Sequence, residues 1–179
     1  MTELFGMPIK GGKIHGRNVV EQKPLDDLKQ VFLDLLADPN VVEFGWTQYT
    51  PHFNDGDICE FSVGQSWVRT VSDGEDADHF DLEVGDFHPS LGTQRCVAGK
   101  LTEEERQAYR TENHTSYAPV DKWERIPQEC KYPETAELAS KLTDIQLGCY
   151  ENAMLEAFGD HAEVTVTREG FQIDEYYHD

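Results

Sequence analysis

The fold is organised by residues 41–50, VVEFGWTQYT. These residues are rich in β-branched and aromatic side chains, the composition typical of a β-strand. In a strand, Phe44, Trp46 and Gln48 face one side, and the residues between them face the other. Because two large rings on one face need a layer to cover them, the segment predicts a strand in a sheet with one buried face.

Further strands are expected on either side of this one in the chain. Residues 58–63 and 66–71 have strand composition, so residues 41–71 read as a three-stranded meander. Near the C-terminus, residues 162–177 predict a hairpin whose three-residue loop ends in glycine. We expect the meander and the hairpin to join in a single antiparallel sheet of about five strands.

Two helices are predicted to cover that sheet. Residues 25–37 and, over a longer stretch, residues 134–158 carry apolar side chains at helical spacing. Thr102 and Glu105 form the pattern of a capping box, which predicts a third, shorter helix after them. Segregated strands and helices of this kind indicate the α+β class.

A length of 179 residues suits a single domain over residues 1–179. Residues 1–22 are rich in glycine and show no helical period, which predicts an extended arm. The arm also contains no apolar leader segment, and the chain holds no apolar run of membrane-spanning length. A cytoplasmic protein that does not enter membranes is therefore expected.

Charge is the most unusual property of the chain. It carries 35 acidic and 15 basic residues, a net charge of −20. Residues 30–94 hold thirteen acidic residues and one basic residue, Arg69, while residues 142–179 hold nine acidic residues and one basic residue, Arg168. Such a balance argues against direct nucleic-acid binding through a broad basic face.

The segment around the first turn resembles a known pattern. Residues 46–63 fit W-x-x-Y-x-P-x-F-N-D-G-D-x-C-x-F, which resembles a hairpin of small uncharacterised proteins encoded by bacteriophages and some bacteria. The resemblance implies a phage or bacterial setting and no particular activity. The matching residues are Trp46, Tyr49, Pro51, Phe53, Asn54, Asp55, Gly56, Asp57, Cys59 and Phe61.

The densest acidic run, residues 73–86, is the predicted binding surface. It does not fit an EF-hand, because glycine and glutamate are missing at the sixth and twelfth positions from Asp73. A solvated loop, a calcium or magnesium site and an acidic recognition surface all remain open. The seven carboxylates are Asp73, Glu75, Asp76, Asp78, Asp81, Glu83 and Asp86.

Two other sets of residues are candidates for a site. Asp55, Asp57 and His79 supply the oxygen and nitrogen ligands that a divalent metal would need, with Asp81, Asp86 and His88 nearby in sequence. The adjacent pair Tyr176 and Tyr177 is hard to bury completely, since neighbours on a strand face opposite ways. Because Tyr is enriched at interfaces, this pair is an interface candidate, and a homodimer is one form of it.

These observations favour a non-enzymatic acidic interaction protein without a cofactor. It would bind and inhibit or modulate a host protein, for example a nucleic-acid-handling one, by acting as a nucleic-acid mimic. One alternative is an enzyme that depends on a divalent metal such as Ca²⁺ or Mg²⁺, held by residues 52–57 and 73–88. Another is an assembly protein that oligomerises through the C-terminal hairpin.

Overall fold

The computed structural model describes residues 3–4, 7–8, 20–52, 56 and 59–177. Near the N-terminus, the short strands β1 (Glu3–Leu4) and β2 (Met7–Pro8) pair with each other. The remainder of the predicted arm lies mostly outside the described residues. The end of the arm is fixed to the body, because the Gln22 side-chain nitrogen donates to the Gly148 carbonyl over 2.7 Å.

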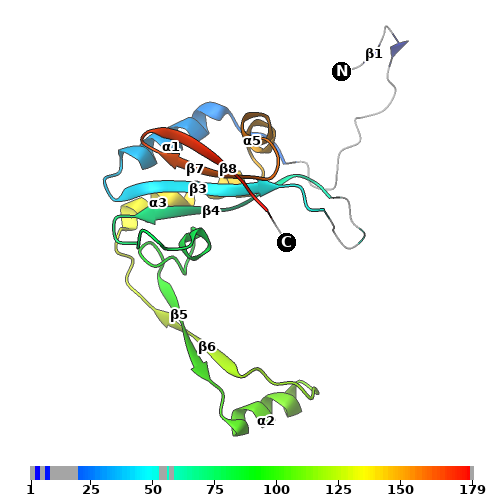
Figure 1. The fold of residues 1–179 in the computed structure, drawn as a ribbon, viewed down its shortest axis with the longest axis vertical. Coiled ribbons are helices and arrows are strands. Elements are labelled where there is room, and N and C mark those ends of the chain that lie inside the picture. The colour runs from blue at the N-terminus through cyan, green and yellow to red at the C-terminus, as the bar shows by residue number, and fades with distance from the viewer. Residues whose placement is uncertain (1–2, 5–6, 9–19, 53–55, 57–58, 178–179) are drawn as a thin grey trace.

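The body is built on an antiparallel sheet with the order β4-β3-β7-β8. Its strands are β3 (Val41–Tyr49), β4 (Ser62–Thr70), β7 (Ala162–Thr167) and β8 (Gly170–Glu175). The α+β class and the joining of meander and hairpin are therefore confirmed (Figure 1).

The predicted strand count was slightly wrong, because the meander has two strands and not three. Where residues 58–63 and 66–71 were expected to be separate strands, the chain forms the single strand β4. A register shift opposite Trp46 and Gln48 lets β4 continue through the expected turn as a bulge.

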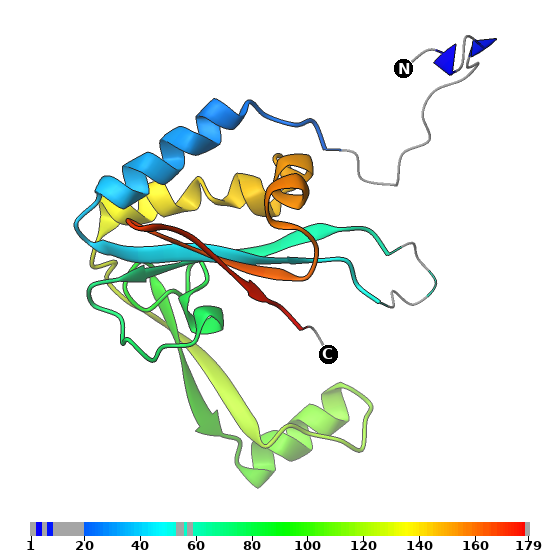
Figure 2. The ribbon, with the colours of Figure 1, turned by 45° about the horizontal axis from the view of Figure 1, so that its top comes forward.

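One face of the sheet is buried under helices. Phe44, Trp46 and Gln48 all have 0% exposure, which confirms the predicted inward face of β3. Helix α1 (Leu25–Ala37) matches its predicted bounds and packs Phe32 against Phe44 at a ring distance of 5.1 Å. Figure 2 shows α1 and the helices of residues 133–158 together on this side of the sheet.

The predicted helix over residues 134–158 is divided into three shorter helices. They are α3 (Pro133–Ser140), α4 (Thr143–Gln146) and α5 (Glu151–Phe158). Gly148 separates the last two with a φ of +78°, a backbone conformation that L side chains rarely adopt. The break lets Ile145 of α4 and Met154 of α5 both reach the core.

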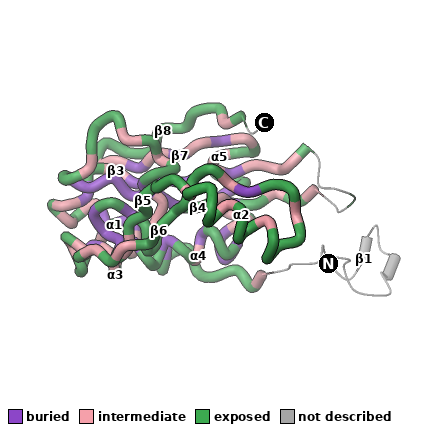
Figure 3. The backbone as a smooth tube through the Cα atoms, turned by 90° about the horizontal axis from the view of Figure 1, so that it is seen from below, coloured by how far each residue is buried: buried purple, intermediate pink, exposed green. Residues whose placement is uncertain are grey.

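The opposite face carries the acidic run and a projecting arm. The run includes a short 3-10 helix, η1 (His79–Leu82), where a weak strand was expected. Beyond it, β5 (Gln94–Lys100) pairs with β6 (Asp121–Pro127), and α2 (Glu103–Glu112) begins at the predicted capping box. We call residues 94–127 the β5–β6 arm; Figure 3 shows it mostly exposed.

Gln48 is a polar residue in the centre of the apolar core. Its side-chain oxygen accepts a hydrogen bond of 3.0 Å from Trp46 Nε1. Its side-chain nitrogen donates to the carbonyls of Met154 and Gly159, which belong to α5 and its C-terminal cap. Gln48 therefore ties the central strand to the helix layer through a side chain that is itself fully buried.

We predict that Gln48→Leu lowers the free energy of unfolding by about 2–3 kcal/mol, because it leaves the Trp46 N–H and two carbonyls without partners. Urea denaturation would measure the change. The matched control Gln146→Leu alters an exposed position of α4 and should change stability by less than about 0.5 kcal/mol. An equally small effect of both substitutions would contradict the role assigned to Gln48.

Candidate functional site

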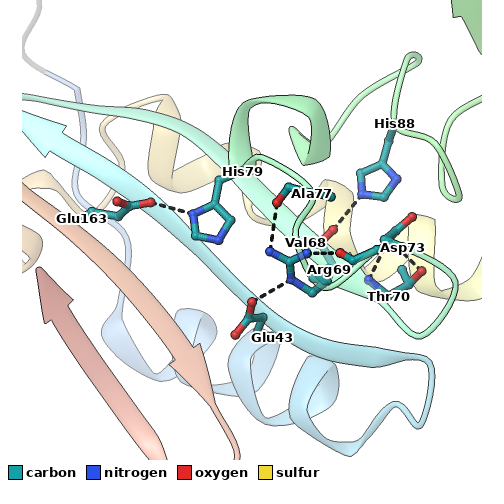
Figure 4. Close-up of polar contacts among 10 residues, drawn as sticks. Glu43, Val68, Arg69, Thr70, Asp73, Ala77, His79, His88 and Glu163 are labelled. Atoms are coloured by element: carbon teal, nitrogen blue, oxygen red, sulfur yellow. Dashed lines mark hydrogen bonds and ion pairs between the residues drawn. The ribbon is translucent and has the colours of Figure 1, made fainter.

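The acidic run is held in place by a buried cation. The Arg69 side chain is 8% exposed, and its Nε donates to Glu43 Oε1 over 2.8 Å. Its two terminal nitrogens donate to the carbonyls of Gly74 and Ala77 (Figure 4). Arg69 therefore holds the start of the run against β4, and its charge is paired inside the protein.

Asp73 anchors the same segment from the other side. One carboxylate oxygen accepts hydrogen bonds from the Thr70 N–H and hydroxyl, each 2.8 Å, and from the Ser90 hydroxyl at 3.1 Å. These bonds close the turn that follows β4. Asp73 was predicted to belong to the binding surface, but its hydrogen bonds give it a structural role in this turn.

His88 is buried next to this network. Its Nε2 lies 2.7 Å from the Val68 carbonyl, and its Nδ1 accepts hydrogen bonds from the Ser90 and Leu91 N–H groups, each 3.1 Å. A ring with one donor and one acceptor nitrogen is neutral. Burial lowers the pKa of His88, more than the Val68 carbonyl and the Asp73 charge raise it.

His79 joins the acidic run to the C-terminal hairpin. Its ring stacks on Trp67 with centroids 3.6 Å apart and planes 9° from parallel. Its Nδ1 lies 2.6 Å from Glu163 Oε1 on β7. Trp67 in turn lies against Gly45, where an added Cβ would be 2.7 Å from the indole ring, so only glycine leaves space for this stack.

A groove of about 500 Å³ opens around this stack on the face of the sheet opposite α1. Burial raises the pKa of Glu83, which faces the side-chain amide of Gln65. The groove is lined by Thr47, Gln65, Trp67, Ala77, Asp78, His79, Phe80, Glu83, Glu163 and Tyr176.

The remaining carboxylates of the run project into solvent. Asp78 also caps η1 by accepting a hydrogen bond of 3.0 Å from the Phe80 N–H. We call this set the acidic loop surface. It consists of Glu75, Asp76, Asp78, Asp81 and Asp86, all exposed.

The two cations of the acidic stretches are both engaged within the chain. Arg69 is buried as described above. Arg168 donates to the carbonyls of Asp38 and Val41 over 3.0 and 2.8 Å. Among the described residues, neither guanidinium forms an ion pair with a carboxylate of the acidic loop surface, since Arg69 pairs with Glu43 and Arg168 binds carbonyls.

The predicted metal-binding residues are not brought together among the residues that the structure describes. Asp55 and Asp57 lie outside the described residues. His79 contacts Glu163 and Trp67, while His88 is buried in a hydrogen-bond network of its own. Across the described part of the chain, no group of three or more His, Cys, Asp or Glu side chains is placed to hold a metal ion.

The residues that fit the pattern over residues 46–63 have separate roles. Trp46 is a core residue, and Gly56 has a φ of +96°, as a turn requires. Phe53 and Asn54, like Asp55 and Asp57, fall outside the described residues. Tyr49 is half-buried and lies beside Tyr176, with ring centroids 5.6 Å apart.

The two candidate interface tyrosines differ in environment. Tyr176 is half-buried at the groove, and burial raises its pKa. Tyr177 is 76% exposed. Tyr177 is therefore the one of the two whose ring is available to a partner.

Several residues of the site were not anticipated. Arg69 is the one base in a long acidic stretch, and that isolation was a signal of a buried structural cation. Pairing of His79 with Glu163 could not be inferred, because the two are brought together by tertiary folding. Trp67 was expected to be an ordinary strand residue and is the platform of the groove.

Comparison with known proteins adds no relative: no protein-family description, no curated protein and no solved structure matches this chain. Among the described residues, no helix is long and apolar enough to cross a membrane.

We predict that Arg69→Met lowers the free energy of unfolding by about 3 kcal/mol, because it leaves the half-buried Glu43 without its cation. Hydrogen exchange should also become faster across residues 73–93. The matched control Arg95→Met removes an exposed cation and should leave both properties nearly unchanged. Unchanged exchange in Arg69→Met would contradict the anchoring role.

His88 should make stability depend on pH. Its pKa is lower in the folded state, so below about pH 6.5 the unfolded state binds a proton that the folded state does not. The free energy of unfolding should therefore fall as pH decreases through this window. In His88→Gln that slope should be smaller, while His114→Gln, at an exposed position, should keep the wild-type slope.

Proposed function

We propose that this protein is a non-enzymatic acidic interaction protein that binds a basic surface of another protein. The acidic loop surface and the neighbouring groove would make the contact. By occupying that basic surface, the protein would inhibit or modulate its partner. The resemblance to phage-encoded proteins supports a host protein of the bacterial cytoplasm as the target.

The observation that carries this proposal is that acidic residues of both stretches meet on the groove side of the sheet. The pairing of β3 with β7 and the contact of His79 with Glu163 bring Glu163 next to the acidic run. Asp174 of β8 is paired with Glu163 and lies on the same side of the sheet, so both carboxylates add to the charge of the acidic loop surface. Charge concentrated in this way accelerates encounter with a basic partner and excludes acidic ones.

The projecting arm does not cancel this potential. The β5–β6 arm contains six basic and six acidic residues. Several of its ions pair internally, as when Arg110 lies 2.9 Å from Glu103. The net negative charge thus belongs to the body of the protein, where the groove and the acidic loop surface lie.

Nucleic-acid mimicry is the finer form of the proposal. The acidic run includes η1 and is not a strand with carboxylates at regular spacing. A mimic would therefore have to present an irregular cluster of charges in place of the phosphates. A nucleic-acid-handling partner that duplex DNA displaces would support this form.

The test uses two variants of equal net charge. In the first, the acidic loop surface is neutralised by Glu75→Gln, Asp76→Asn, Asp78→Asn, Asp81→Asn and Asp86→Asn. In the control, five exposed carboxylates away from that surface are neutralised by Glu21→Gln, Asp27→Asn, Glu134→Gln, Glu137→Gln and Glu156→Gln.

We expect immobilised wild-type protein to capture a basic partner from bacterial lysate and to release it at moderate salt, because screening weakens contacts between charges. Mass spectrometry identifies the partner. The control variant should retain it and the acidic-loop variant should lose it. Equal capture by both variants, or release that does not depend on salt, would contradict the proposal.

A further inference from the structure

The two edges of the sheet are treated differently by the fold. At the β4 edge, residues of the acidic run form a bridge: Trp67 pairs with Glu83, and the Val84 N–H donates to the Ser66 carbonyl over 2.8 Å. At the other edge, β8 has β7 as its neighbour, and no other described strand pairs with it. One edge is thus covered and the other is open (Figure 3).

The open edge presents regular backbone groups. β8 pairs with β7 through all six of its residues without a register shift. The Tyr176 N–H donates to the His161 carbonyl, so alternation along the ladder turns the N–H and C=O groups of Phe171, Ile173 and Glu175 outward. Proline, lysine and bulges, with which proteins usually protect an edge, are absent from β8.

The side chains of the same residues extend the apolar face of the sheet. Phe171 and Ile173 are paired with Val166 and Val164, which are buried. The Phe171 ring lies 5.3 Å from Phe158 of α5, yet 54% of Phe171 and 50% of Ile173 remain exposed. An added strand with apolar side chains on this side would complete the layer.

The surroundings of the edge are negative. Asp174 and Glu175 are exposed at its end, and Glu169 is exposed in the loop before it. The nearby cation in the sequence, Arg168, is engaged with backbone carbonyls. A strand that carries Lys or Arg on the side of Asp174 would match both the charge and the backbone of this edge.

We propose that β8 is the docking site for an extended basic segment of the partner protein, in which apolar and basic residues alternate. The segment adds a fifth strand to the sheet, with its apolar side chains beside Phe171 and Ile173 and its basic side chains beside Asp174. The proposal rests on the proposed function and names the part of the partner that the acidic face attracts.

A second copy of this chain suits the edge less well. Pairing of two β8 strands would bring Glu169, Asp174 and Glu175 of both copies together, and β8 contains no cation to offset them. Like charges in this arrangement oppose association. A basic segment would not meet this repulsion. Self-association through β8 would therefore contradict the proposal.

The experiment uses the full chain and a short blocked peptide of alternating valine and arginine. We expect binding at low salt, with slower hydrogen exchange at the amides of Phe171, Ile173 and Glu175. Ile173→Pro removes an outward N–H without touching the bonds to β7, and should weaken binding by about tenfold or more. The control Ile173→Val should bind like wild type.

A second peptide separates edge pairing from attraction by charge alone. Methylation of its valine amides keeps every charge and removes the donors that face β8, so its binding should be lost. Equal binding of the methylated peptide would show that the β8 edge is not the site. The same conclusion would follow if Ile173→Pro left binding unchanged while the acidic-loop variant weakened it. Either result would leave the proposed acidic function standing. A dimer that Ile173→Pro dissociates, or no binding of the unmethylated peptide, would also overturn the proposal.

Discussion

Strand β3 pairs with β7 from Phe44–Val166 to Gln48–Ala162, and this ladder connects the two halves of the protein. On the helix side it places Trp46 beside Val164 in the core. On the other side it sets Glu163 within reach of His79. The core and the groove, with the carboxylates that meet there, therefore depend on one register, because a slip by one residue would exchange the two faces of each strand.

The acidic run is compatible with this fold because a cation lies beneath it. Arg69 is buried among Glu43 and two carbonyls of the run, so it organises the run without pairing with its exposed carboxylates. Asp73 and His88 complete the same turn through hydrogen bonds. The exposed carboxylates are consequently displayed on a segment fixed to the sheet, which reduces the ordering that a partner would have to impose.

Local sequence patterns predicted helices and strands well where local forces decide them. The 25–37 helix and the capping box at Thr102 were predicted correctly, because apolar spacing and caps act within a few residues. Strand β6 was missed in a stretch read as loop, because its side chains are mostly exposed and its order comes from pairing with β5. The helix over residues 134–158 was predicted too long. Its breaks change the direction of the chain as it crosses the sheet, and the apolar spacing does not show them.

By itself, the sequence determined the α+β class, the inward face of β3 and the two acidic stretches, because composition and periodicity record burial and charge directly. Only the tertiary structure decided that Arg69 is internal and that His79 of the first stretch meets Glu163 of the second. It also decided that one edge of the sheet is covered and the other open. These are relations between residues distant in sequence, and they are fixed by strand register and packing, which no local pattern encodes.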